Sequence, residues 1–502
     1  MSVKVLFIYP TPFRVTGLPV GLASLTSVLK EKNVEVKIFD TAFYPTDHDE
    51  DQTKIRSERM MSKEVRNEES FLPENTTKLE TDLVNLVDSY RPDLIGISIL
   101  EVMYDTSRNL TRLIKKNFPL LPIIAGGVFP TLSPNLVLEE KSIDMICLGE
   151  GETALAELCE RLSKKKEYLD IEGLWVKRDG AIYKNRPSCL HDINTLPFPD
   201  FSEFDPRLFY KPMQGKMYKM INIESSRGCG NKCTYCAAPR LRTFFEENDC
   251  GRYNRNMKME RVIEQIYSQI KKHQTEFIYF SSENFLSIPP GEFRFFIEEY
   301  EKIKIPFWIQ TRIETITKDR LEELRKVGMH WMTIGLEHGN EGFRKKVLKR
   351  NYTNKMFFEK MEILRELDMG ASLNNVIGFP DETRDLIFDT IHMNRTLWQR
   401  NHKLENNVFV FTPFRGCELY EVAKEKGLLG DAPFVSQSDL SDETVLRFPE
   451  VFKKDIKGLA KTFNLYVRLP EEFFEKIRAA EENTPEGNTV FNELSKMCLN
   501  IT

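Results

Sequence analysis

Residues 220–236 read MINIESSRGCGNKCTYC and join an apolar, strand-like run to three closely spaced cysteines. The run Met220–Ser225 has the length and apolar content of a buried strand, and Cys229, Cys233 and Cys236 follow it in a loop. Three thiolates from one loop can bind one face of a cube-shaped iron–sulfur cluster and leave its fourth iron open to a chelating molecule. This stretch therefore predicts a metal centre at the carboxyl end of a strand.

Zinc is the main alternative metal that these thiols could bind. Structural zinc sites use four ligands in a tetrahedron, and Cys250 is the only candidate for the fourth. Three buried thiols without a metal are a second alternative. Arg227 and Lys232 flank the cysteines, and their charges are expected to favour the thiolate form that binds metal. Spacing and context together favour the cluster.

Length and composition place the chain among ordinary globular proteins. Its 502 residues suffice for two or three domains, and a formal net charge of −5 gives no indication of a nucleic-acid-binding face. No apolar run reaches the length of a membrane span, and no signal-peptide pattern is present. We therefore expect a cytoplasmic enzyme with no nucleic-acid partner and no membrane span.

The cysteine loop opens a series of six βα units within residues 215–425. Six such units predict a partial (β/α)6 barrel whose active face lies at the carboxyl ends of the strands. The expected strands are Met220–Ser225, Phe277–Ser281, Phe307–Thr311, Trp331–Leu336, Ser372–Ile377 and Val408–Thr412. The expected helices include Met259–Lys272, Lys318–Val327, Lys355–Leu367 and Arg384–Gln399.

Residues 1–167 show a similar alternation and predict a doubly wound α/β domain. Most of its strand-like runs are continuously apolar, as parallel strands covered on both faces require; Val34–Phe39 alternates and is expected near a sheet edge. Charged residues between 41 and 76 indicate a solvated insertion. The expected strands are Val3–Tyr9, Val34–Phe39, Leu94–Ile99, Leu121–Ala125 and Ile143–Cys147, and the expected helices are Val20–Glu31, Thr77–Tyr90, Asp105–Asn117 and Thr153–Lys164.

Residues 168–214 are expected to form a hairpin and a linker between the two domains. Two strand-like runs flank Asp179-Gly180, a dipeptide that suits a two-residue hairpin turn, and four prolines follow between 189 and 219. Residues 426–502 are expected to form a small helical C-terminal region, for which the sequence indicates no role.

The spacing C-x3-C-x-aromatic-C after the first barrel strand resembles the radical S-adenosylmethionine (SAM) superfamily, over about residues 215–420. The resemblance implies a [4Fe-4S] cluster bound by the catalytic residues Cys229, Cys233 and Cys236. It also implies SAM chelated by the open iron, and an external electron donor of the flavodoxin or ferredoxin type. The residues that it implies for SAM binding are Tyr235, Ser281, Ser282, Glu283, Arg312, Glu337, Gly378 and Thr412.

Each SAM-binding expectation rests on a position after a barrel strand. Residues 281–283 stand where the family usually carries Gly-Gly-Glu, and the two serines are tolerable because main-chain atoms make that contact. Arg312 matches a position that typically pairs with the methionyl carboxylate, and Glu337 resembles an acidic contact to SAM. Residues 376–383 (VIGFPDET) resemble a segment beside the adenosine, and residues 411–413 would close the adenine side.

The first domain resembles the flavodoxin-like cobalamin-binding domain that is fused to many radical SAM enzymes, over about residues 1–165. It contains no D-x-H-x-x-G, and Phe129 occupies the histidine position of the family's G-G-x-H-P-T, so cobalamin without a protein histidine on cobalt is implied. A degenerate domain that only packs on the barrel is the alternative. The implied contacts are Gly126, Gly127, Pro130, Thr131, Gly149 and Glu150, with Leu100, Glu101 and Val102 covering the lower face.

The fusion of the two domains implies a cobalamin-dependent radical SAM enzyme, first of all a methyltransferase. Such an enzyme uses a 5′-deoxyadenosyl radical and methylcobalamin to methylate an unactivated carbon of a small-molecule substrate. A cyclase, ring-contracting or rearranging enzyme with the same cofactors is the alternative. A non-catalytic, metal-stabilised binding protein is the alternative of another class. These motifs describe cofactors, so the substrate, the axial ligand of cobalt and the oligomeric state stay open.

Overall fold

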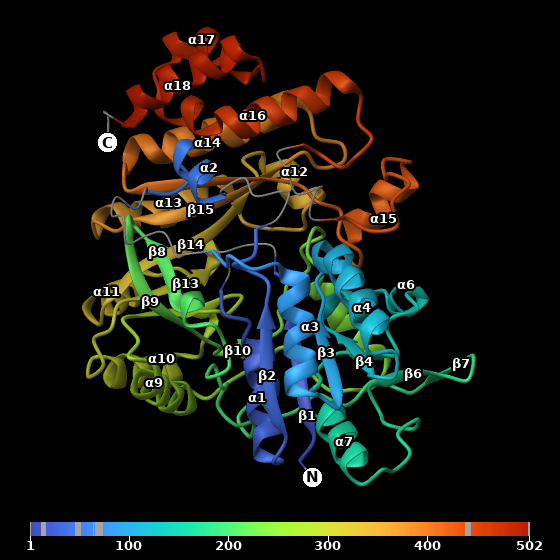
Figure 1. Ribbon diagram of the computed structural model, residues 1–502. Coiled ribbons are helices and arrows are strands. Elements are labelled where there is room, and N and C mark those ends of the chain that lie inside the picture. The colour runs from blue at the N-terminus through green and yellow to red at the C-terminus, as the bar shows by residue number, and fades with distance from the viewer. Residues whose placement is uncertain are drawn as a thin grey trace.

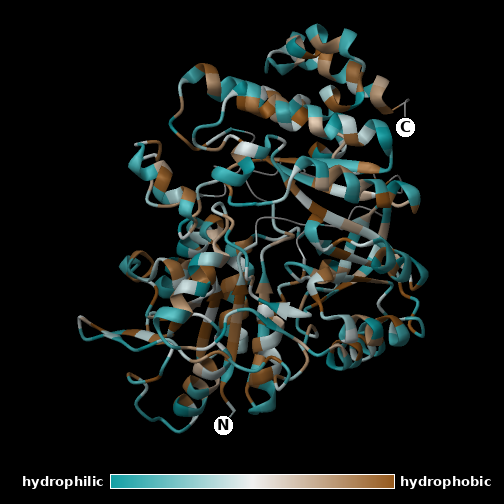
Figure 2. Cartoon of the chain, turned by 180° about the vertical axis from the view of Figure 1, so that it is seen from behind, coloured by the Kyte–Doolittle hydropathy of each residue, from teal (hydrophilic) through white to brown (hydrophobic). Residues whose placement is uncertain are grey.

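The computed structural model describes residues 2–11, 17–45, 52–63, 65, 74–436 and 443–499. Two seven-stranded sheets form two domains side by side, and helices of the C-terminal region cover one end of the second domain (Figure 1). Hydrophobic residues concentrate on the strands in the interior of each domain (Figure 2). Among the described helices, none combines the length and apolar composition that crossing a membrane requires.

The N-terminal sheet has the strand order β2-β1-β3-β4-β5-β6-β7. Its first five strands are parallel, in the 2-1-3-4-5 order of doubly wound, flavodoxin-like domains. The alternating strand β2 lies at the edge, as expected from its pattern. The strands are β1 (Lys4–Tyr9), β2 (Glu35–Asp40), β3 (Leu94–Ser98), β4 (Ile123–Gly126), β5 (Met145–Cys147), β6 (Leu174–Arg178) and β7 (Ala181–Lys184). The helices are α1 (Val20–Glu31), α3 (Leu79–Tyr90), α4 (Tyr104–Asn117), α5 (Val128–Leu132), α6 (Pro134–Glu139) and α7 (Glu152–Ser163).

The hairpin β6–β7 belongs to this same sheet. Asp179 and Gly180 have φ angles of 53° and 81°, the two positive values that a tight type I′ turn requires. Strand β6 pairs antiparallel with β5, so the first sheet extends past residue 167, where the sequence predicted the domain to end.

The second sheet has the order β16-β15-β14-β13-β12-β9-β8, and six of its strands are parallel. The predicted partial (β/α)6 barrel is confirmed, with β8 added antiparallel at one edge. The strands are β8 (Tyr210–Met213), β9 (Lys216–Ile223), β12 (Phe277–Phe280), β13 (Phe307–Thr311), β14 (Met329–Glu337), β15 (Ala371–Ile377) and β16 (Leu404–Val410). The helices are α8 (Ala238–Glu247), α9 (Met259–His273), α10 (Pro290–Tyr300), α11 (Lys318–Lys326), α12 (Glu341–Lys346), α13 (Asn354–Glu366), α14 (Arg384–Arg400) and α15 (Glu418–Glu425).

The short elements lie mostly in the loops of the two domains. A two-stranded ribbon, β10 (Ser226–Arg227) and β11 (Arg255–Asn256), frames the cysteine loop. Strand β16 ends before Thr412, which the sequence had placed inside it, because Pro413 has no N–H with which to continue a ladder. The 3₁₀ turns are η2 (Glu101–Met103), η3 (Pro206–Phe209), η4 (Phe285–Ser287), η5 (Ile313–Thr315) and η7 (Glu471–Phe473).

The C-terminal helices α16 (Glu450–Arg468), α17 (Phe474–Glu481) and α18 (Pro485–Leu499) pack against α14 and β16. Helix α2 (Gln52–Glu58) lies on the same side of the barrel (Figure 1). The residues that follow it, Met60 and Met61, are buried in this C-terminal core. The expectation of a solvated insertion at 41–76 is therefore wrong for these residues, because their two apolar side chains fill a gap beside the barrel. It is also wrong at the start of the range, where Ala42, Phe43 and Tyr44 are buried, and part of the remainder lies outside the described residues.

Candidate functional site

The cysteine loop joins β10 to α8, and its three thiols share one pattern of contacts. Each sulfur accepts one hydrogen bond: Cys229 from Asn231 Nδ2 at 3.2 Å, Cys236 from the Ala238 N–H at 3.4 Å, and Cys233 from Arg312 Nη1 at 3.5 Å. Hydrogen bonds to cysteine sulfur stabilise negative charge there and tune the potential of a bound cluster. Each sulfur therefore has one donor that would stabilise a metal-bound thiolate.

The loop is supported from both sides. Arg242 of α8 donates to the carbonyls of Gly230 at 2.8 Å and Asn231 at 3.5 Å. Thr234 Oγ1 donates to the carbonyl of Val347 at 2.7 Å. These bonds satisfy backbone groups that an isolated loop would leave to water, so the loop has a defined shape without a metal.

A mononuclear metal site does not form among the described residues, where no group of three or more His, Cys, Asp or Glu side chains could hold one ion. Cys250, the candidate fourth zinc ligand, instead directs its sulfur to the carbonyls of Pro187 and Asn248 at 3.5 and 3.4 Å. A four-iron cluster is compatible with this spacing, because each cysteine binds a different iron.

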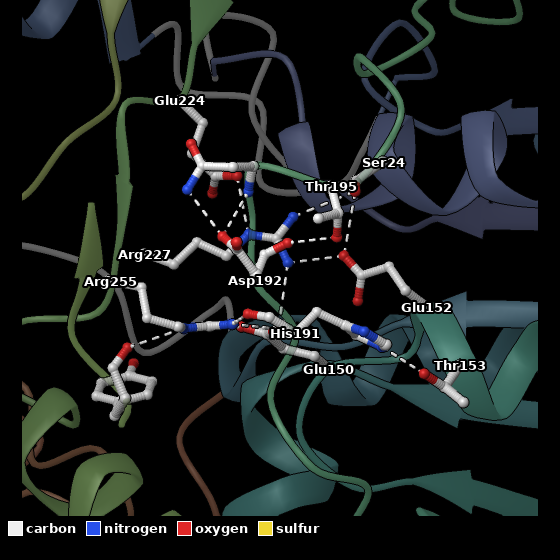
Figure 3. A network of polar contacts seen from close by, with 12 residues as sticks. Ser24, Glu150, Glu152, Thr153, His191, Asp192, Thr195, Glu224, Arg227 and Arg255 are labelled. Atoms are coloured by element: carbon white, nitrogen blue, oxygen red, sulfur yellow. Dashed lines mark hydrogen bonds and ion pairs between the residues drawn. The ribbon is translucent and has the colours of Figure 1, made fainter. Parts of the chain in front are cut away.

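Arg227 does not face the thiols, and the expectation that its charge favours their ionisation is wrong. Its guanidinium contacts Glu152 at 2.7 Å, Glu224 at 2.8 Å, Glu150 at 3.3 Å and Ser24 Oγ at 3.2 Å (Figure 3). Burial lowers the pKa of Arg227, but these carboxylates outweigh burial and raise it above its ordinary value. Arg227 therefore joins the first domain to the barrel two residues before the cysteine loop.

The surroundings of Cys236 favour the protonated thiol. Burial raises its pKa to about 11, and the N–H of Ala238 opposes this only in part. The thiolate form at this position therefore depends on a bound cation, which deprotonates a coordinating thiol.

The expected SAM contacts after β12 and β13 lie around the same loop. Ser282 is buried and its hydroxyl hydrogen-bonds that of Ser225, while Ser281 donates its N–H to the carbonyl of Ile223 at 3.0 Å. Glu283 is exposed, although partial desolvation raises the pKa of its carboxyl group. Arg312, besides its contact with Cys233, pairs with Glu314 at 2.6 Å. The structure thus brings Arg312 to the cysteine loop, as its predicted role requires.

Glu337 lies at the end of β14 in a left-handed conformation, with φ of 64°. Its carboxylate pairs with Arg350 at 2.6 Å, and Arg350 also donates to the Tyr235 hydroxyl at 3.1 Å. Nε and Nη2 of Arg350 are buried without a partner among the described residues. Sequence reasoning missed Arg350, because its neighbours Lys349 and Asn351 make it resemble an ordinary surface cation.

Gly378 follows β15 with φ of 83°, and a buried pair holds its loop. Glu382 accepts the N–H of Phe379 at 2.9 Å and the N–H of Gly378, and His338 Nε2 lies 2.9 Å from its second oxygen. The N–H of Asn340 donates to His338 Nδ1 at 3.0 Å, so Nδ1 is unprotonated and Nε2 carries the proton that Glu382 accepts. Glu382 belongs to the segment 376–383, but nothing in the sequence indicated its partner.

Thr412 lies just after β16, and its hydroxyl contacts the carbonyl of Val410 at 3.4 Å. Its own carbonyl accepts the N–H of Phe414 at 2.9 Å. The residue therefore stands at the carboxyl end of the last barrel strand, where the expected adenine contact requires it to be.

In the first domain, the glycine loops after β4 and β5 meet at Thr131. Its hydroxyl donates to the Gly127 carbonyl at 2.8 Å and accepts the Gly149 N–H at 2.9 Å. Gly127 has φ of 109°, and a Cβ there would lie 2.8 Å from the Ile99 carbonyl oxygen. Gly149 has φ of 76°, and a Cβ there would lie 2.8 Å from the ring of Phe245 on α8. Both positions therefore require glycine, because their positive φ angles and their close packing against Ile99 and Phe245 leave no room for a side chain.

Other expected cobalamin contacts differ in their surroundings. Pro130 is buried in α5, and Gly126 is the last residue of β4. Glu150 is engaged with Arg255, with one bond at 3.2 Å, and with Arg227 (Figure 3). Its carboxylate therefore holds the domain interface.

The loop after β3 contacts a distant segment of the chain. Glu101 is buried, and its carboxylate accepts the N–H groups of Arg415 at 2.8 Å and Val435 at 3.0 Å. Val102 packs with Val435 in a small apolar cluster. Leu100 keeps 44% of its surface exposed, so of these three residues it has the side chain most available to cover a ligand.

The donor sets fit the implied groups. Three thiols with one donor each suit a cluster with an open iron, and the buried, partly unpartnered Arg350 suits a site for an anionic or polar ligand. Two glycine-containing loops, joined by Thr131, lie at the carboxyl edge of the first sheet, where a doubly wound domain binds its ligand. Because no histidine lies in these glycine loops, any axial ligand to cobalt there would come from another source.

Comparison with known proteins gives consistent findings. The model of the Radical SAM superfamily matches residues 223–393, and that of the B12 binding domain matches residues 11–159. An uncharacterized methyltransferase of Pyrococcus horikoshii is 25% identical over 421 residues, covering 82% of this chain and 80% of that protein. An anaerobic magnesium-protoporphyrin IX monomethyl ester cyclase of a Synechocystis species is 26% identical over 364 residues, covering 70% and 68%.

A solved structure shares almost the whole fold. The cobalamin-dependent S-adenosylmethionine radical enzyme OxsB, with aqua-cobalamin and S-adenosylmethionine bound, superposes with a TM-score of 0.68 at 16% identity. The match covers 99% of this chain and 71% of that chain.

Proposed function

This chain belongs to the cobalamin-dependent radical SAM enzymes, and from that premise we propose that it methylates an unactivated carbon of a small-molecule substrate. When bound, the cluster, SAM and cobalamin supply the electron, the 5′-deoxyadenosyl radical and the methyl group. The protein chain binds these molecules, orients them and excludes water.

The observation that carries the proposal is the contact between Gly149 and Phe245. Phe245 lies on α8, the helix that begins directly after the cysteine loop, and its ring lies against the backbone of the loop after β5. The helix that follows the cysteine loop thus touches the glycine loop after β5 of the first domain. This contact supports a proposal in which the cysteine loop would hold the cluster, and the glycine loops would hold cobalamin, on adjoining parts of the two domains.

In this proposal Cys229, Cys233 and Cys236 bind three irons, and Arg312 orients the carboxylate of SAM while its guanidinium contacts Cys233. Arg350 holds Glu337 in place and restrains Tyr235 between the second and third cysteines. The remaining SAM contacts are Ser281, Ser282, Glu283, Gly378 and Thr412.

For cobalamin, the glycine loops around Gly127 and Gly149 form the platform, and Thr131 keeps them together. Leu100 would cover the lower face, while Glu101 keeps the 415–435 segment closed over the edge of the domain. Burial raises the pKa of the Glu101 carboxyl, and the two N–H groups that it accepts oppose this change.

A cyclase or rearranging enzyme with the same cofactors is the second candidate, and it is supported by the similarity to the anaerobic cyclase. The two candidates differ in their products. Methyl transfer yields 5′-deoxyadenosine and S-adenosylhomocysteine in equal amounts, because a second SAM restores the methyl donor. Rearrangement yields no S-adenosylhomocysteine.

The test uses anaerobic holoenzyme, a strong one-electron reductant and SAM that carries deuterium in its methyl group. A small-molecule extract serves as the substrate source, and mass spectrometry follows the products. We expect a product with three deuterium atoms together with both SAM-derived products. A Cys233→Ser variant is the matched control and should give none. Formation of 5′-deoxyadenosine without S-adenosylhomocysteine or a labelled product would refute methyl transfer and favour the second candidate.

A further inference from the structure

Two cysteines outside the cysteine loop lie together at the boundary of the two domains. Cys189 belongs to the linker after β7 and is exposed, whereas Cys250 follows α8 and is buried. A backbone hydrogen bond of 2.8 Å from the Leu190 N–H to the Cys250 carbonyl aligns the two segments. Residues 61 positions apart in the chain are therefore neighbours in the fold.

The two thiols differ in their surroundings. The Cys250 sulfur faces the carbonyls of Pro187 and Asn248 at 3.5 and 3.4 Å, and Arg186 Nη2 lies 3.6 Å from the Cys189 sulfur. The exposed Cys189 sulfur is accessible to a disulfide that arrives from solvent. Burial raises the pKa of Cys250, and its neighbour Cys189 adds to this. Cys189 is thus suited to react first and Cys250 to react second.

We propose that Cys189 and Cys250 form a reversible disulfide by exchange with a low-molecular-weight disulfide such as oxidised glutathione. The Cys189 thiolate attacks one sulfur of oxidised glutathione, breaks its S–S bond and releases one glutathione thiolate. The Cys250 thiolate then attacks the Cys189 sulfur of this mixed disulfide and releases the second glutathione. The two protein thiols lose two electrons and two protons in total, and one oxidised glutathione becomes two reduced glutathiones.

Access to Cys189 is open on the side from which the small disulfide would come. A pocket of about 420 Å³ is lined by residues that follow each cysteine in the chain, among them Leu190 and His191 after Cys189 and Arg252 and Asn254 after Cys250. The guanidinium of Arg252, which is exposed, complements a carboxylate of glutathione, whereas that of Arg255 is paired with Glu150. The mixed-disulfide stage therefore has room and compatible charge.

The bond would join the domains beside the cysteine loop. On one side, the linker is tied to the first domain by Ser188 Oγ, which donates to the Glu172 carbonyl at 2.9 Å, and by His191, which contacts Thr153 (Figure 3). On the other side, residues 250–256 lead into β11, which pairs with β10 immediately before Cys229. Oxidation would therefore restrain the domain interface, whatever reaction the enzyme catalyses.

The test treats anaerobic holoprotein with oxidised glutathione, blocks the remaining thiols and digests with trypsin under non-reducing conditions. We expect peptide 185–207, in which Pro187 protects the Arg186 bond, to be linked to peptide 243–252. Dithiothreitol should separate them. A Cys250→Ala variant should instead accumulate glutathione on Cys189, and a Cys189→Ser variant should leave Cys250 unmodified.

Cys159→Ser, which changes a buried cysteine of α7, is the matched control and should retain the linkage. Circular dichroism and iron content verify that each variant is folded and loaded. The linked peptide of the wild-type protein decides the matter even if a variant fails to fold. Glutathione on Cys189 of the wild-type protein without a link to Cys250, or two unmodified thiols, would overturn the proposal.

Discussion

Arg350 and Glu337 form a buried ion pair of 2.6 Å at the carboxyl end of β14. The same guanidinium contacts the Tyr235 hydroxyl at 3.1 Å, and Tyr235 lies between Cys233 and Cys236. One arginine thereby connects the cysteine loop to a barrel strand end. A Cβ at Gly335 would lie 2.1 Å from Glu337 Oε1, so the pair also requires a glycine two residues earlier.

Removing Arg350 tests this connection. We expect Arg350→Met to lower the free energy of unfolding by roughly 3–5 kcal/mol, because Glu337 is left as a buried, unpaired charge. Urea unfolding of matched samples measures the change. Arg365→Met, which breaks an exposed pair with Glu362, is the control and should have no measurable effect. Equal stability of the two variants would mean that Arg350 and Glu337 are not a buried pair in solution.

The glycine beneath this pair gives an independent test. Gly335→Ala should reduce both the stability and the SAM affinity of the protein, because the new methyl group displaces the Glu337 carboxylate. Isothermal titration and thermal unfolding measure the two effects. Gly291→Ala, at a helical position with open space around it, should be neutral or slightly stabilising. Unchanged SAM binding in Gly335→Ala would separate Glu337 from the SAM site.

The cysteine assignment predicts metal content directly. Serine at Cys229, Cys233 or Cys236 should abolish or strongly reduce the bound iron and remove the electron paramagnetic resonance signal of the reduced cluster. Cys250→Ser should keep both, because the sulfur of Cys250 faces the carbonyls of Pro187 and Asn248. Loss of iron in Cys250→Ser alone would instead implicate Cys250 as a ligand.

Arg227 should couple the two domains energetically. A double-mutant cycle with Arg227→Met and Glu152→Gln is expected to give a coupling of about 0.5–3 kcal/mol, because the pair is buried and joins separate domains. Chemical unfolding provides the four free energies. The exposed pair Arg240–Glu247 should give no measurable coupling in the same experiment. Additive effects of Arg227→Met and Glu152→Gln would argue against coupling across the interface.

Asp40 at the end of β2 predicts a pH dependence of stability. Burial raises the pKa of its carboxyl to about 7, against the charge of Lys211, and one of its oxygens is buried without a partner. The unfolded chain releases this proton near its ordinary pKa of about 4, but the folded chain keeps it until about pH 7. The contribution of Asp40 to stability is therefore complete at low pH and is lost as the pH rises to about 7.

Asp40→Asn should remove this dependence, which has a limiting slope on the order of 1 kcal/mol per pH unit. Melting temperatures between about pH 5 and pH 7 measure it against Asp88→Asn, a change at an exposed position of α3. Lys211 does not confuse the result, because burial lowers its pKa only to about 8, above this window. Parallel pH profiles of the Asp40→Asn variant and the wild-type protein would contradict the prediction.

Local patterns in the sequence determined the order of strands and helices, the partial barrel, the doubly wound first domain and the cysteine loop. Strand burial, helix periodicity and the Asp179-Gly180 turn depend on residues that are close in the sequence, so they can be predicted from the sequence alone. The cysteine spacing is likewise local. Positions after strands, such as Arg312 and Gly378, followed from the rule that parallel strands bring their carboxyl ends to one edge.

Only the tertiary structure decided which charges are buried and with what partners. Arg227 and Arg350 resemble surface cations in the sequence, yet each is buried against carboxylates from other elements. Glu101 closes a loop formed by residues more than 300 positions away, and Cys189 meets Cys250 across the linker. The physical reason is that a charge pair or a thiol pair requires proximity in space, and proximity between distant residues leaves no periodic pattern in the chain.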